Sequence, residues 1–147
     1  SSRRIQEVTI NGQRAGEFHI FSYAAADLGI PTALISGDAA ICAQAKELQP
    51  TIETVVSKRG VAAAVVSRHP SAVERSLEET ARRALSGDLG RYRYQLPSHF
   101  RVTVSYQKHY DASYASHYFH TRRLDAHTVE FQADDYTEVL RFFHFVL

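Results

Sequence analysis

The chain has 147 residues, of which 44% are hydrophobic, and this is enough for one globular domain with its own core over residues 1–147. With 17 basic and 16 acidic residues it has no charge excess that would attract nucleic acid or an anionic membrane, so we expect neither partner. A single cysteine excludes an internal disulfide, and no long apolar run or signal-like leader occurs, so we expect a cytoplasmic protein.

The chain begins Ser1-Ser2-Arg3-Arg4 and contains no methionine, so we interpret this start as a position within a longer translated product. A natural cleavage that leaves two chains associated and a boundary of another origin both fit the sequence.

The first elements are a strand, a tight turn and a helix. Asn11-Gly12 favours the two positive φ angles of a hairpin turn, which predicts a strand over residues 5–10. A helix is predicted over residues 17–28, because apolar residues recur there at helical spacing. These residues are Phe18, Phe21, Ala25 and Leu28.

A strand, a helix and a second strand follow. The apolar run 32–35 predicts a strand, and Asp38 is placed to cap a helix through Ile41 and Leu48. Residues 51–57 are rich in β-branched side chains and predict a strand. Residues 60–66 have no clear period, and we expect a helix there.

The next predicted helix begins at Ser71, since Ser71 and Glu74 have the spacing of a capping box. Leu77, Ala81 and Leu85 would form its buried face, and Gly87 would end it. Residues 88–98 are predicted to be a surface connection.

Apolar and polar residues alternate strictly over residues 100–106, which predicts a strand with an exposed polar face. Val129 and Phe131 repeat the pattern around Glu130. Asp134 or Asp135 would cap a terminal helix. Strands that alternate with helices predict an α/β layered architecture.

Two stretches carry a family resemblance: Asn11-Gly12-Gln13-Arg14-Ala15-Gly16-Glu17, and the sequence from Tyr23 through Pro31 to Ser36-Gly37-Asp38. They resemble the zinc-dependent bacterial D-aminopeptidase family, whose members assemble into self-compartmentalising particles. The resemblance covers nearly all of this chain but only the C-terminal half of the family's length, which implies the C-terminal part of a larger peptidase fold.

The resemblance implies a metallo-aminopeptidase that hydrolyses short peptides, with zinc as its cofactor and Glu17 as a metal ligand. The other ligands, an Asp and a Glu in an acidic motif and two histidines, would come from an N-terminal half or a companion subunit. An upstream histidine would act in catalysis. This chain alone would then be inactive, and a higher homo- or hetero-oligomer is expected.

The residues near Glu17 depart from the family, which usually has small residues and an asparagine there. This sequence has Phe18, His19 and Phe21 instead, which affects the shape of the pocket. His19 should not reach the metal of Glu17, because residues i and i+2 lie about 200° apart on a helix. Residues 60–69 are shorter than the matching family stretch and lack an arginine often found there.

Other interpretations stay open. Without the resemblance, Glu17 is a solvated first-turn acid, which helix N-termini favour generally. His117 and His120, with His109 and His127 nearby, allow a histidine-only metal site, although no metal-binding motif requires it.

Three further features have alternative roles. Tyr110, Tyr114 and Tyr118 recur every four residues and would form one helical stripe, either at an interface or over the core. Ser1 allows an N-terminal-Ser hydrolase, in which the α-amine acts as base. The whole chain could instead be a non-catalytic assembly subunit.

Overall fold

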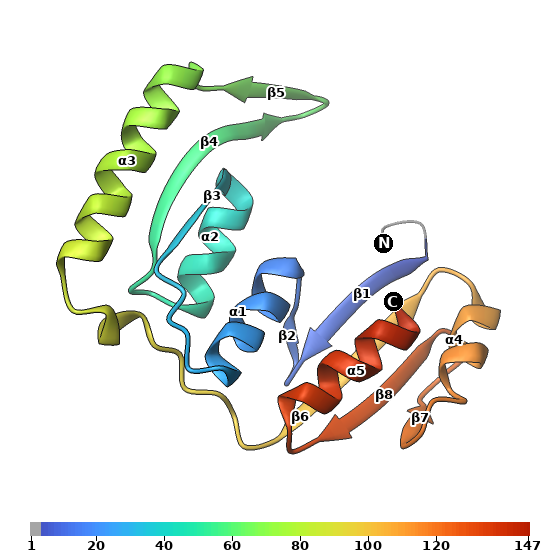
Figure 1. The fold of residues 1–147 in the computed structure, drawn as a ribbon. Coiled ribbons are helices and arrows are strands. Elements are labelled where there is room, and N and C mark those ends of the chain that lie inside the picture. The colour runs from blue at the N-terminus through green and yellow to red at the C-terminus, as the bar shows by residue number, and fades with distance from the viewer. Residues whose placement is uncertain (1–3) are drawn as a thin grey trace. The chain divides into compact units, whose positions relative to one another are not determined.

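The computed structural model describes residues 4–147 and has the predicted mixed architecture of strands and helices (Figure 1). Its contacts divide the chain into two compact units. One unit contains residues 4–27 and 96–147, and the other contains residues 28–95.

The first unit is built on a five-stranded antiparallel sheet with the strand order β2-β1-β6-β8-β7. Its elements are β1 (Ile5–Ile10), β2 (Gln13–Arg14), α1 (Glu17–Asp27), β6 (Phe100–Tyr106), α4 (His109–Ala115), β7 (Thr121–Arg123), β8 (Thr128–Ala133) and α5 (Tyr136–Val146). The predicted strands at 5–10, 100–106 and around Glu130 are therefore confirmed, as are the first and last helices.

The core of this unit lies between the sheet and α5. The apolar residues of β6 are all buried, as their alternation predicts, and Val8 and Ile10 of β1 pair beside them. Phe142 of α5 stacks on Phe131 of β8 with ring centroids 4.6 Å apart. Asp135 caps α5 by accepting a hydrogen bond of 2.8 Å from the Thr137 amide. This apolar layer supplies most of the driving force for folding the unit.

The opposite face of the sheet is polar. Thr9 and Thr103 hydroxyls lie 2.7 Å apart across β1 and β6, and Ser105 and Thr128 lie 3.1 Å apart across β6 and β8. An antiparallel sheet with one apolar and one polar face is the expected result of a two-residue alternation.

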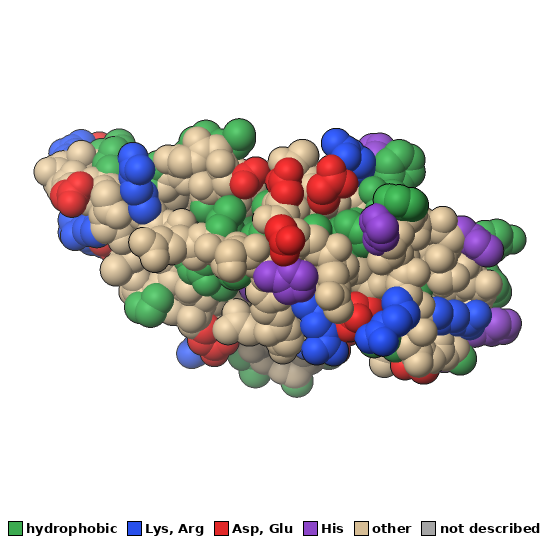
Figure 2. Space-filling view, turned by 90° about the horizontal axis from the view of Figure 1, so that it is seen from below, with side chains coloured by type: hydrophobic (Ala, Val, Ile, Leu, Met, Phe, Trp, Pro, Cys, Tyr) green, Lys and Arg blue, Asp and Glu red, His purple; other side chains and the backbone are tan. Residues whose placement is uncertain are grey.

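Figure 2 shows one face of the molecule, on which acidic and basic side chains both occur and hydrophobic side chains reach the surface between them.

The second unit has a three-stranded sheet in which β3 is parallel to β4, and β4 is antiparallel to β5. Its elements are β3 (Leu34–Asp38), α2 (Ala39–Leu48), β4 (Glu53–Val61), β5 (Ala64–Ser67), α3 (Pro70–Ser86) and the short 3-10 helix η1 (Leu89–Tyr92). The Asp38 cap is confirmed, since its side chain accepts a hydrogen bond of 2.9 Å from the Ile41 amide. The strand expected at 32–35 begins two residues later.

Three expectations for the second unit are wrong. Residues 60–66 form no helix but the end of a β4–β5 hairpin, in which Gly60 pairs with Val65. Helix α3 begins at Pro70 after His69, so Ser71 does not cap it. Its buried residues are Thr80 and Ala84, whereas Leu85 is 69% exposed.

Within residues 4–147, no helix combines the length and the apolar character that are needed to cross a lipid bilayer.

Candidate metal-ligand site at the start of helix α1

The turn before Glu17 has the geometry that its sequence predicts. Asn11 and Gly12 have φ angles of 51° and 80°, and the turn joins the pairs Ile10–Gln13 and Thr9–Arg14. The Asn11 amide side chain donates to the His99 carbonyl at 2.9 Å and accepts from the Arg101 amide at 2.7 Å. These bonds fix the turn to the beginning of β6.

The path from the turn to the helix is short and hydrogen-bonded. The Ala15 amide donates to the Val8 carbonyl at 2.8 Å, which holds the chain against β1. One residue later, the Gly16 carbonyl accepts the first helical bond from the Ile20 amide at 3.1 Å. Glu17 is thus the first residue of α1, and the sheet determines its place.

Helix α1 is not buried on the face that its apolar spacing predicts. The buried residues are His19, Ser22 and Tyr23, while Phe21 is 67% exposed. At 100° per residue, Glu17 and Phe21 lie on the side opposite to this buried face. The predicted apolar face is therefore wrong for Phe21.

Glu17 itself is exposed, and among residues 4–147 its carboxylate has no hydrogen-bond or ion-pair partner. The positive end of the helix dipole lies at the same end of α1 and stabilises negative charge there. A free, exposed carboxylate at this position is able to bind a cation.

His19 lies on the buried side of α1 and is 3% exposed. Burial lowers the pKa of its imidazole, although a hydrogen bond to the Arg14 backbone opposes the shift. Its Nε2 atom has no partner among the described residues, and its ring meets Tyr23 edge-on with centroids 4.4 Å apart. His19 therefore packs on the side of α1 away from Glu17, as the helical arithmetic predicts.

The other candidate residues are dispersed. His109 and His127 have ring centroids 6.4 Å apart, and His117 and His120 lie in the exposed segment after α4. No three His, Cys, Asp or Glu side chains in the described part of the chain are grouped as a metal site would require. Ser1 lies outside the described residues.

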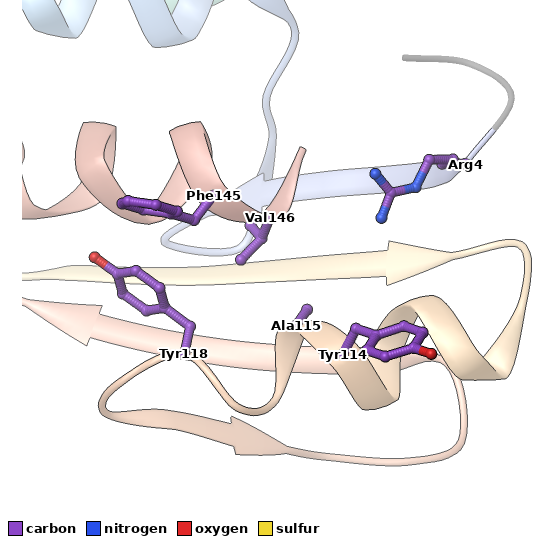
Figure 3. A pocket seen from close by; sticks show the side chains of 6 residues that line it. All are labelled: Arg4, Tyr114, Ala115, Tyr118, Phe145 and Val146. Carbon is purple, nitrogen blue, oxygen red and sulfur yellow. The ribbon is translucent and has the colours of Figure 1, made fainter.

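The tyrosine stripe is only partly helical. Tyr110 and Tyr114 lie on α4 and are 46% and 74% exposed, but the helix ends before Tyr118. Tyr114 and Tyr118 instead border a surface cavity of about 230 Å³ with Phe145 and Arg4 (Figure 3). The Arg4 guanidinium also pairs with Asp111 at 3.2 Å.

Sequence reasoning missed the cluster of polar side chains around Glu130 on the polar face of the first sheet. Glu130 is 2% exposed and accepts hydrogen bonds from Arg101 at 2.6 Å, Arg122 at 2.9 Å and Gln132 at 3.0 Å. Burial by itself raises the pKa of Glu130, but the hydrogen bonds from these three side chains outweigh it and the pKa lies below its usual value. Because two guanidinium groups bind the one carboxylate, we interpret this cluster as two structural ion pairs that share Glu130.

The comparisons with known proteins agree with this fold. The α/β chain matches a peptidase family model, that of the D-aminopeptidases, over residues 1–145. The chain therefore belongs to the D-aminopeptidase family, as the resemblance predicts. No curated protein sequence matches it.

A solved structure has the same fold with a TM-score of 0.84 and 23% sequence identity. It is a zinc-dependent D-aminopeptidase, DppA from Bacillus subtilis, described as a self-compartmentalizing protease. The match covers 97% of this chain and 54% of that one, so the chain spans about half the length of the solved protein.

Proposed function

We propose that this chain supplies Glu17 as one zinc ligand of an aminopeptidase that removes the N-terminal residue, such as a D-amino acid, from short peptides. The observation that carries the proposal is the free, exposed Glu17 carboxylate at the first position of α1. Membership of the D-aminopeptidase family and the likeness to a zinc-dependent enzyme support it.

The residues present fit zinc as a partial site. Carboxylate oxygen is an accepted zinc ligand, but a stable site takes three or four protein ligands. Residues 4–147 offer no group of three such side chains, so Glu17 needs ligands from a preceding half or a companion subunit. When bound, zinc would activate water as the nucleophile and polarise the peptide carbonyl.

The contribution of this chain is to hold the backbone of one ligand in place. The Asn11 turn is bonded to β6, and Ala15 is bonded to β1, so the first turn of α1 has little freedom to move. A ligand whose backbone is held in place before the metal arrives loses less conformational entropy on binding than one on a mobile segment.

Two exposed apolar features support an interaction of this chain with a partner chain. Phe21 is exposed on the side of α1 that carries Glu17. The β4–β5 hairpin is exposed throughout residues 58–70, and Val61, Val65 and Val66 are each at least half exposed. In the described chain β5 pairs only with β4, and such a free strand edge tends to pair with another chain. These features also favour the second candidate, a non-catalytic assembly subunit.

The test is Glu17→Gln in the complete assembly, where Gln keeps the size but removes the negative charge. If Glu17 is a ligand, zinc content should fall, and turnover of a D-alanyl peptide should drop by about 100-fold or more. The matched control is Glu74→Gln, since Glu74 is also an exposed helical glutamate.

Preserved zinc with preserved turnover in Glu17→Gln would refute the ligand assignment. An assembly that holds no zinc before any mutation would favour the non-catalytic subunit. Comparing D-alanyl with L-alanyl peptides determines the stereochemical preference.

A further inference from the structure

Phe21 differs from the other exposed phenylalanines of this chain by its position close to Glu17. It lies one helical turn after Glu17, and residues i and i+4 of a helix are neighbours with Cβ atoms about 5–6 Å apart. Phe119 and Phe145 are similarly exposed, at 77% and 69%, but Phe119 lies between α4 and β7 and Phe145 lies on α5. Single exposed apolar residues are common on protein surfaces, so the position of Phe21 carries the argument and its exposure alone does not.

Helix geometry favours a Phe21 ring that leans toward Glu17. Side chains on a helix lean toward its N-terminus, so each covers the turn before its own Cα atom. For Phe21, that turn is the one that begins with Glu17. Any metal on the Glu17 carboxylate would have an apolar aromatic wall beside it.

The rotation of α1 is fixed by its buried side. The Tyr136 hydroxyl donates to the Ile20 carbonyl at 2.8 Å, directly before Phe21. Tyr23 packs edge-on against Tyr136 and Phe100, with ring centroids 5.5 Å and 6.2 Å away. Because this face of α1 is held against the sheet and α5, Phe21 and Glu17 both lie on the opposite, exposed side of the helix.

We propose that Phe21 determines specificity by forming a wall of the pocket for the side chain of the first residue of the peptide. This inference rests on the proposed function, because the metal at Glu17 would hold the scissile end of the peptide next to the ring. A rigid ring at this place limits the space available, so the favoured substrates are peptides with a small apolar first residue. Larger first residues, such as leucine, are disfavoured.

The experiment compares Phe21→Ala and Phe21→Leu with the unmutated protein in the complete, zinc-loaded assembly. Two peptides that differ only in a D-alanine or a D-leucine at the first position serve as substrates. One extra or missing methylene group in an apolar pocket changes the discrimination between substrates by roughly 10-fold to 200-fold. Phe21→Ala should therefore raise the ratio of kcat/KM for the D-leucyl over the D-alanyl peptide by about 10-fold or more, with Phe21→Leu intermediate.

A second readout is independent of turnover. Calorimetric titration with free D-leucine should show tighter binding to Phe21→Ala than to the unmutated assembly, with equal zinc content in both. Phe119→Ala is the matched control, since it removes an equally exposed ring elsewhere, and it should leave both measurements unchanged.

An unchanged ratio in a zinc-loaded Phe21→Ala assembly would refute this inference and leave the proposed function standing. Loss of assembly in both Phe21 variants would also overturn it, since Phe21 would then be a contact between chains. An unmutated assembly without zinc-dependent turnover would refute the proposed function, and the inference with it.

Discussion

Glu130 is a buried carboxylate on the polar face of a sheet, and its surroundings explain why it tolerates burial. Arg101 on β6 and Arg122 on β7 approach it from the two neighbouring strands, and their side chains are 60% and 71% exposed. The carboxylate is thus desolvated while its partners remain in water. Such a pair gains less than its short distances suggest, because burial offsets part of the attraction.

Glu130→Gln should lower the free energy of unfolding by about 1–3 kcal/mol at pH 7, the usual cost of removing one partner of a charged hydrogen bond. The pKa of Glu130 in the folded chain lies below its ordinary value of 4.5, so the folded state favours the ionised form. This stabilisation is complete above pH 4.5 and is lost as the pH falls through the lower folded pKa. Urea unfolding between pH 7 and pH 3 should show the difference between variant and unmutated chain shrinking below pH 4.5.

The control for this measurement is Glu138→Gln. Glu138 pairs with Arg141, but both side chains are about half exposed, and exposed ion pairs contribute about 0–1 kcal/mol. A difference for Glu130→Gln that stays constant down to pH 3 would contradict the assigned role of its charge.

At the scale of elements, the sequence predicts secondary structure best where residues close together in the chain determine it. The Asn11-Gly12 turn, the strict alternation of 100–106 and the Asp38 cap all match the structure. Each depends on residues next to one another, so a pattern of a few positions is sufficient to identify it. The position of Glu17 at the start of α1 was predictable for the same reason.

The β4–β5 hairpin was missed because its turn has no turn-forming residues. Ala62 adopts a φ angle of 51°, which is uncommon for a residue other than glycine, asparagine or aspartate. The start of α3 did have a signal, since proline is favoured at the first helical position. Pro70 occupies that position, and the Ser71 hydroxyl bonds to the His69 ring at 2.8 Å instead of capping the helix.

The buried face of α1 and the Glu130 cluster could not be predicted, because both depend on which strands and helices become neighbours. His19 and Tyr23 are buried since α5 and β6 cover that side, and Arg122 meets Glu130 through the β7–β8 register. Neither the order of strands nor their register is visible in one sequence.

The exposed hairpin has a testable consequence for association. Val65→Thr combined with Val66→Thr should reduce self-association of the isolated chain, because the change makes the free edge polar while threonine retains a high strand propensity. Sedimentation velocity should show a shift toward the monomer, with an unchanged circular dichroism spectrum. Leu85→Gln on α3 alters a side chain of similar exposure away from the hairpin, and an equal effect there would contradict a specific role for the β5 edge.

At the scale of the whole molecule, the fold is that of about half a D-aminopeptidase, with 54% of the solved chain covered. The candidate ligand lies at one helix start, and the described residues contain no cluster of three His, Cys, Asp or Glu side chains that would form a metal site. The chain thus has the family fold, and the proposed zinc site would need ligands in addition to Glu17.

The isolated 147-residue chain should therefore bind zinc poorly and hydrolyse no D-alanyl peptide. One carboxylate cannot supply the three or four ligands of a stable zinc site, and a single exposed ligand competes weakly with water for the ion. Titration with zinc, followed by calorimetry and by metal analysis after gel filtration, should show less than one retained ion per chain.

Stoichiometric binding with micromolar affinity would contradict the partial site and would point to a histidine site made by His109, His117, His120 and His127. In that event, replacing His109 and His127 with alanine should abolish binding while Glu17→Gln leaves it intact, which identifies where the ion is held.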